Sequence, residues 1–363
     1  MPSATSAATA ATPRFSSVDS LRGLTVAAML LVNNAGDWNH IHPWLQHAPW
    51  HGCTPADLIF PLFLFIAGVS LSLALEPQRE LGRSPAALRL AVLWRAARVF
   101  ALGLLLHLVA ALLIPERDLR LPGVLQRIGL CIAVAGPVAL YLKPRAQWVL
   151  AGALLIGYSL LLAFTGVAID HNPALVIDSA VLGRFAYRYD PATGLAFDPE
   201  GLVSTLGAVM TTLLGLRAGH WLRHARLAVL AAAGVAAIAT GAWLHLLQPM
   251  NKSLWTPAFV LWSGGIACLA LLAAHWLADR RGLWLPGGAL GRNAILAYAG
   301  SWLMVCMLAA TGADSWLYRH AFASWLAPLA GSTAASAAWA AAVTGVWWLV
   351  SLPLDRKRWY WKI

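Results

Sequence analysis

Long apolar runs recur along the chain, and each run of about 20 residues is long enough to cross a bilayer as a helix. Composition supports this interpretation, because 60% of the 363 residues are hydrophobic and only 11% are charged. Soluble domains rarely reach such values. The sequence therefore predicts an all-α polytopic membrane protein with about ten transmembrane helices, at residues 18–38, 55–76, 88–114, 123–142, 147–168, 201–222, 226–248, 254–278, 288–312 and 332–354.

Two further segments do not fit a transmembrane helix. Residues 1–15 are small and polar, without the apolar centre of a signal peptide, so we expect a disordered N-terminal tail. Residues 16–363 are then expected to form a single transmembrane domain. The segment 315–329 is rich in Trp, Leu and Ala but also contains an Arg and a His, which favours an interfacial helix over an eleventh span.

The basic residues predict the orientation. The net charge is +11, but Lys and Arg fall into short clusters between apolar runs, as topology signals do, so no nucleic-acid partner is expected. Placing both termini in the cytoplasm puts all but seven of the 26 Lys and Arg residues at the inner side. The exceptions are Arg117, Arg120, Arg127, Arg184, Arg188, Lys252 and Arg319.

The stretch from Asn33 to Asp57 concentrates polar side chains between the first two spans and contains no Lys or Arg, so it is expected to face the extracytoplasmic side. His47 lies in the loop, while Asn33 and Asp57 lie near the outer ends of the flanking helices, so the three can approach one another. An imidazole, a carboxylate and an amide can take a proton, orient the base and hold a carbonyl, which general-base or acyl-transfer chemistry requires. The same stretch holds His40, His42 and His51.

Other interpretations of this stretch remain open. Thr54-Pro55-Ala56-Asp57 is a good helix start, in which Asp57 caps the helix. Asp57 has either this role alone or this role together with the orientation of a neighbouring imidazole. The loop's tryptophans suit an interfacial belt. A zinc site is a rival use of the four histidines, but their spacing matches no familiar closed site, so we expect no metal.

Seven sequence blocks together resemble the heparan-α-glucosaminide N-acetyltransferase family of membrane acyltransferases. They follow the family order over nearly the whole chain, and the combination is specific although no single block is. The resemblance is to a compact bacterial member without the long luminal N-terminal domain. The blocks are SVDSLRGLTVAAMLLVNNAG, QHAPWHGCTPADLIFPLFLFIAGVSLSL, RLPGVLQRIGL, FDPEGLVSTLGAVMTTLLGLRAG, NKSLWTPAFVLWSGG, GRNAILAY and DRKRWYWKI.

The resemblance implies transfer of an acetyl group from cytosolic acetyl-CoA to a glucosamine amine across the membrane. It gives His47 the catalytic role, as base or acetyl carrier, and Asn33 the partner role, with Asp57 in the block that reads ADLIFPLFLFIAG. The implied acceptor is an amino sugar or related glycan. A bacterial inner-membrane location, contact with membrane lipid and a homodimer are further expectations from the resemblance.

A cytosolic acyl-CoA donor carries phosphates and needs cations at the inner face. No nucleotide-binding Gly-rich loop is present, so ATP and NAD have no support as cofactors. A cation that enters a transmembrane helix is costly, which indicates a functional or paired role. The candidates for donor binding are Arg22, Arg95, Arg127, Arg292 and Asn293.

Two other points stay open. The DPEG block, residues 198–201, starts the sixth span and favours a helix cap over a contact with the acceptor. The alternative to an enzyme is a membrane transporter or a scaffold protein. A transporter would show repeated halves with broken helices, and no convincing repeat relates the first five spans to the second five.

Overall fold

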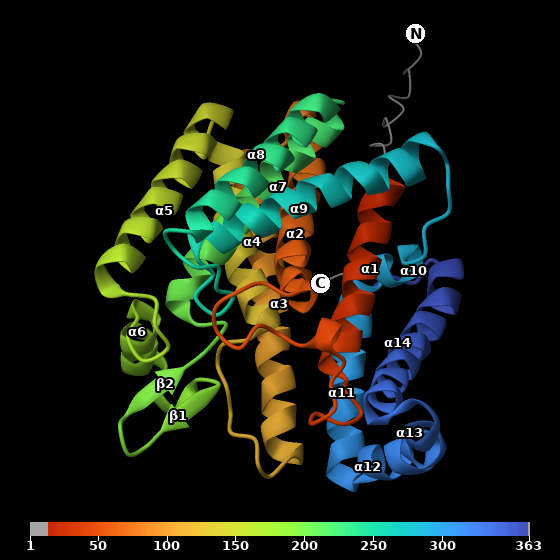
Figure 1. The fold of residues 1–363 in the computed structure, drawn as a ribbon. Helices are drawn as coiled ribbons and strands as arrows, with labels where there is room; N and C mark the ends of the chain where they lie inside the picture. Colours follow the sequence, from red (N-terminus) through yellow and green to blue (C-terminus); the bar gives the residue numbers. More distant parts are fainter. Residues whose placement is uncertain (1–13, 362–363) are drawn as a thin grey trace.

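The computed structural model describes residues 14–361, so residues 1–13 of the predicted tail lie outside the described part. The prediction of an all-α polytopic protein is confirmed: the described chain is a helical bundle with one small hairpin (Figure 1). Within residues 14–361, nine helices are long and apolar enough to cross a membrane. They are α2 (Ile59–Glu80, preceded by the 3-10 turn η2, Pro55–Leu58), α3 (Pro85–Leu113), α4 (Val124–Tyr141), α5 (Pro144–Thr165), α7 (Leu202–Arg223), α8 (Leu227–His245), α9 (Pro257–Ala274, continued by the π-helical turn His275–Arg280), α11 (Ala294–Thr311) and α14 (Ser332–Arg356).

These nine correspond to the second to tenth predicted spans. The first, 18–38, forms the helix α1 (Ser16–Asn33), which packs against α2, α10 and α14. Its serines and the charged pair Asp19–Arg22 make α1 less apolar than the others, and it is not among the nine. The first predicted span, and with it the total of ten, therefore stays a prediction.

Short elements connect the long helices, and of these the sequence predicted only the non-spanning helix at 315–329. Between α5 and α7 lie α6 (Pro173–Leu182), the 3-10 turn η3 (Gly183–Phe185) and an antiparallel hairpin of β1 (Arg188–Asp190) and β2 (Leu195–Phe197). The predicted span 288–312 is divided at Asn293 into α10 (Gly288–Arg292) and α11. Segment 315–329 forms part of α12 (Ala313–Tyr318), a π-helical turn (Arg319–Ala323) and α13 (Ser324–Ala330), beside the ends of α11 and α14 (Figure 1).

The packing of α2 against α7 sets the position of the site. A Cβ on Gly68 of α2 would lie 2.0 Å from the Thr212 carbonyl oxygen, and a Cβ on Gly215 of α7 would lie 2.0 Å from the Phe65 carbonyl oxygen. Only glycine permits this approach, so the two backbones are in direct contact. The helix α2 therefore holds the residues at both of its ends in fixed positions relative to α7.

The cap predicted for the DPEG block is wrong. Gly201 is the N-cap of α7 and provides no side chain; instead, the Leu202 N–H donates to Asp178 of α6 at 2.9 Å. Asp198 and Glu200 both accept hydrogen bonds from Arg120. Burial and the adjacent Asp198 favour the neutral form of Asp178 and raise its pKa to about 6.

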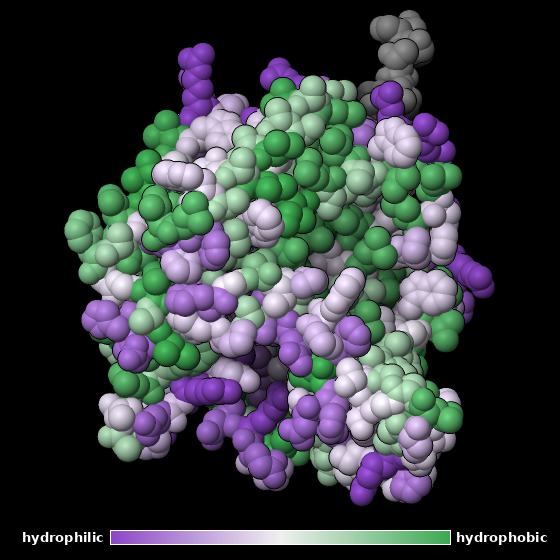
Figure 2. Space-filling model, in the orientation of Figure 1, coloured by the Kyte–Doolittle hydropathy of each residue, from purple (hydrophilic) through white to green (hydrophobic). Residues whose placement is uncertain are grey.

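The surface separates apolar from polar regions. Figure 2 shows hydrophobic side chains over much of the upper and middle parts of the face, and polar side chains gathered around a hollow in its lower part. A broad apolar band of this kind fits a bilayer-embedded bundle with a polar opening at one end.

Candidate active site

His47 and Asp57 form a direct pair at the N-terminal end of α2. The two ring nitrogens of His47 are distinct, and Nδ1–H donates to Oδ1 of Asp57 at 2.8 Å. The Asp57 side chain is 1% exposed, whereas that of His47 is 42% exposed. A buried carboxylate that holds Nδ1–H fixes the tautomer and leaves Nε2 as the basic nitrogen.

The second oxygen of Asp57 is held by the loop itself. Oδ2 accepts hydrogen bonds from the backbone N–H of Ala48 at 3.1 Å, the backbone N–H of Thr54 at 2.9 Å and the Thr54 hydroxyl at 3.0 Å. Thr54 and Asp57 form the capping box that the sequence motif predicts. The carboxylate therefore caps the helix and orients the imidazole at the same time.

Lys252 joins the pair from the loop between α8 and α9. Its Nζ lies 3.2 Å from both Nδ1 and Nε2 of His47 and 3.8 Å from Oδ1 of Asp57. Burial lowers the pKa of Lys252 from its ordinary value, and the Asp57 carboxylate opposes this shift. Sequence reasoning did not assign Lys252 a role, although its place among the cations that violate the inner-side rule was a signal.

These residues line a cavity of about 710 Å³ that also reaches Asn33, Tyr298 and Trp302. Asn33 is exposed at the end of α1. The structure thus brings Asn33, His47 and Asp57 to one cavity, but no hydrogen bond joins Asn33 to His47. The amide faces space that a bound substrate could fill.

The same cavity is lined by most of the seven Lys and Arg residues that the predicted orientation does not place at the inner side. Arg120 is neutralised by Asp198 and Glu200. Three other arginines line the cavity: Arg117, Arg184 and Arg188. None of them has a carboxylate partner among residues 14–361, and each stacks on an aromatic ring. The distances are 5.5 Å from Arg117 to Trp302, 5.0 Å from Arg184 to Phe185 and 5.7 Å from Arg188 to Tyr187. Stacked guanidiniums keep their N–H edges available for an anion.

Arg127 lies in the first turn of α4, beside the N-terminal end of α7. It is buried in α4, donates to the Gly201 carbonyl oxygen at 3.1 Å and to the Ser204 hydroxyl, and stacks on Trp255 at 5.1 Å. Its Nε and Nη1 have no hydrogen-bond partner in the described chain. The structure therefore separates Arg127 from the other four residues expected to bind the donor.

The other four lie toward the opposite ends of the helices. Arg22 donates to the Gly291 carbonyl oxygen at 3.2 Å and to the Ser70 hydroxyl at 2.8 Å. Arg292 is held by Asp355 of α14. Asn293 is buried at the break between α10 and α11, and its Oδ1 is unpaired in the described chain. Arg95 is exposed on α3 and forms no ion pair with any described residue.

Comparison with known proteins decides the family. Residues 14–199 match the family model described as heparan-alpha-glucosaminide N-acetyltransferase, catalytic. The chain belongs to this family. The match includes α1, the His47 loop and Asp57, and thus most of the residues around the candidate site.

Two curated relatives carry the same family name. The chain is 28% identical over 357 residues to heparan-alpha-glucosaminide N-acetyltransferase from Homo sapiens, covering 79% of this chain and 52% of the relative. It is 27% identical over 358 residues to the Mus musculus protein of that name, with coverage of 79% and 53%. The chain spans about half the length of the curated relatives it matches.

Proposed function

We propose that this protein is a membrane acyltransferase that moves an acetyl group from cytosolic acetyl-CoA to an amino sugar or related glycan on the extracytoplasmic side. The observation that carries the proposal is the His47–Asp57 pair at a cavity of about 710 Å³. Membership of a family whose relatives are named as N-acetyltransferases supports it. A bacterial inner membrane is the proposed location.

We propose that the transfer is direct. With Nδ1–H held by Asp57, Nε2 of His47 takes a proton from the acceptor amine. The amine attacks the thioester carbonyl carbon, the C–N bond forms, and the C–S bond then breaks to release the CoA thiolate, which receives the proton. Lys252 and Asn33 line the same cavity, and we propose that they hold the carbonyl oxygen as it gains negative charge.

The competing route passes through an acetyl group on Nε2 of His47. We favour the direct route, because a deprotonated amine is already a good nucleophile and needs only a base and orientation. Direct transfer requires the pantetheine arm to reach the outer cavity while the CoA phosphates bind near Arg22 and Arg95 at the inner side. Kinetics with both substrates varied separates the routes: intersecting lines support direct transfer, and parallel lines with trapped acetyl-His47 refute it.

The cavity also bears on the acceptor. Three arginines without carboxylate partners, Arg117, Arg184 and Arg188, line it beside His47. Guanidinium edges bind carboxylates and sulfates in a bidentate manner, so we propose that the acceptor carries an acidic group near its amine. A neutral amino sugar should then be a poorer acceptor than an acidic one, and the difference should shrink in Arg188→Gln.

One assay separates the enzyme from the alternatives of a transporter or a scaffold. The purified protein is incubated with labelled acetyl-CoA and a panel of neutral and acidic amino sugars. An enzyme consumes donor only when acceptor is present, and the product is an N-acetyl sugar. Donor that is never consumed with any acceptor, by protein that still binds acetyl-CoA, would argue against the proposal.

A further inference from the structure

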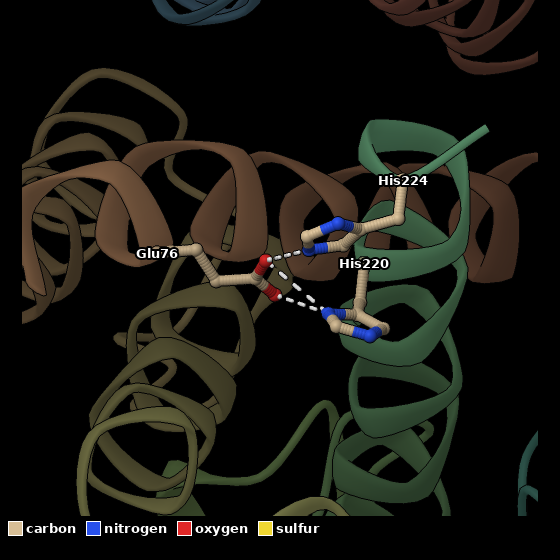
Figure 3. A group of neighbouring side chains, drawn as sticks. All are labelled: Glu76, His220 and His224. Atoms are coloured by element: carbon tan, nitrogen blue, oxygen red, sulfur yellow. Dashed lines mark hydrogen bonds and ion pairs between the residues drawn. The ribbon is translucent and has the colours of Figure 1, made fainter. Parts of the chain in front are cut away.

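A second group of titratable side chains lies at the end of α2 and α7 remote from Asp57. Glu76 is near the C-terminal end of α2, while His220 and His224 lie one turn apart at the end of α7. Figure 3 shows both imidazoles turned toward the Glu76 carboxylate. This i,i+4 spacing places two histidines on one helix face, opposite a carboxylate from the neighbouring helix.

The donor atoms are spaced like those around a small metal ion. Oε2 of Glu76 lies 3.2 Å from Nδ1 of His220 and 3.4 Å from Nε2 of His224. One ligand atom from each of the three residues lies within 4.8 Å of the others. Zinc bonds of about 2.0–2.1 Å in a tetrahedron place neighbouring ligands roughly 3.3 Å apart, which matches both distances.

The carboxylate is oriented by its surroundings. The buried Ser72 hydroxyl donates to Oε1 of Glu76 at 2.7 Å. His220 Nδ1 lies 3.1 Å from Oε1 and 3.2 Å from Oε2, so Oε2 is the oxygen close to both histidines. Arg223 also approaches Oε2 at 3.3 Å, but both of its terminal nitrogens donate to Glu80. An incoming cation would therefore replace this long hydrogen bond and the direct contacts of both imidazoles with the carboxylate, and it would leave the Arg223–Glu80 pair in place.

Glu76, His220 and His224 line a cavity of about 380 Å³. This space has room for the water that completes a tetrahedral shell around three protein ligands. Imidazole and carboxylate ligands suit a divalent transition metal.

We propose that Glu76, His220 and His224 form a binding site for a divalent transition-metal ion, with zinc as the best fit. The site is separate from the outer histidine loop and departs from the expectation of no metal. A bound ion would link α2 to α7 at the end opposite Asp57. Because the backbones of α2 and α7 are in contact along their length, this link would stabilise the helix pair that supports the His47–Asp57 pair.

The test measures zinc bound to the full-length protein, purified in detergent with an affinity tag that contains no histidine. After dialysis against buffered zinc, His220→Ala and His224→Ala should each hold one equivalent less than the wild type. His320→Ala, a matched change of an exposed histidine outside the cluster, should hold as much as the wild type. Ser72→Ala should bind zinc about 10-fold more weakly, because it releases the ligand carboxylate.

Equal zinc content in the wild type and both cluster variants would overturn the proposal. Where an alanine variant fails to fold, Glu76→Gln preserves side-chain volume and should also lose one equivalent. A readout on the wild type needs no variant: zinc should protect His220 and His224, but not His320, from carbethoxylation detected by peptide mass spectrometry. Unprotected cluster histidines at saturating zinc would equally refute the site.

Discussion

Replacing Asp57 by Asn tests how the carboxylate controls His47. Two backbone N–H groups and a hydroxyl donate to Oδ2 at 2.9–3.1 Å, so the amide oxygen of the variant must take that position. The amide NH₂ then faces Nδ1 of His47, which must become an acceptor. The proton moves to Nε2, and the nitrogen that serves as base in the wild type is lost.

The expected effect is large on rate and moderate on stability. Positioned general-base catalysis contributes roughly 10²–10⁴-fold, so the acetyl-transfer rate of Asp57→Asn should fall by about that factor. Loss of the charge-assisted hydrogen bond to His47 should cost about 1.5–3 kcal/mol of folding free energy. Asn is a better choice than Ala, because Ala would also leave the capping donors of Asp57 unpaired.

The assay is the initial rate of acetyl transfer from labelled acetyl-CoA, with acetyl-CoA binding measured alongside. The same loop provides a matched control: Asp37 Oδ2 accepts from His40 Nδ1 at 2.8 Å, but this pair is outside the cavity. Asp37→Asn should retain the wild-type rate. An Asp57→Asn protein that keeps most of its rate, or an equal loss in Asp37→Asn, would refute the reasoning.

Three further results are expected. Burial raises the pKa of Asp178 from 3.8 to about 6, so its charged form destabilises the fold as pH rises through this interval. Asp178→Asn should therefore be more stable than the wild type at pH 8 by up to about 3 kcal/mol, and this difference should be lost near pH 4. Melting curves that show an equal difference at both pH values would contradict this. Arg95→Gln should weaken acetyl-CoA binding more than Arg292→Gln does, because Arg292 is held by Asp355. Added salt should weaken acetyl-CoA binding in the same way. An unchanged affinity for acetyl-CoA in both variants would remove these arginines from the donor site. In Trp44→Cys, the new thiol should be exposed and should react with an impermeant maleimide from outside the cell. Half-buried Cys53 should react slowly, because burial raises its pKa to about 12. Labelling of Trp44→Cys only after access to the cytoplasm would reverse the predicted orientation.

The long helices could be predicted because each apolar run is a local signal. The convergence of Asn33, His47 and Asp57 on one cavity was predictable for a similar reason, since they belong to two consecutive spans and the loop between them. The break at Asn293 was missed, because Gly291, Arg292 and Asn293 were assigned to the polar end of one continuous span. The roles of these site residues remain predictions.

The remaining features depend on contacts between distant parts of the chain. Lys252 reaches His47 across 205 positions, and His220 reaches Glu76 across 144. No periodicity in one sequence encodes such pairings. The cap of α7 was mispredicted for the same reason, because Asp178 lies 24 positions before Leu202 on a short helix that the apolar pattern did not show.

Acetyl transfer by His47→Ala is the most direct measurement of the central claim. The purified variant is compared with the wild type for acceptor-dependent transfer of labelled acetyl, at equal and verified occupancy by acetyl-CoA. The cavity lined by His47 does not include Arg22, Arg95 or Arg292, so donor binding should persist while transfer falls by at least about 10². A His47→Ala protein that transfers acetyl at the wild-type rate would contradict the assignment of the site.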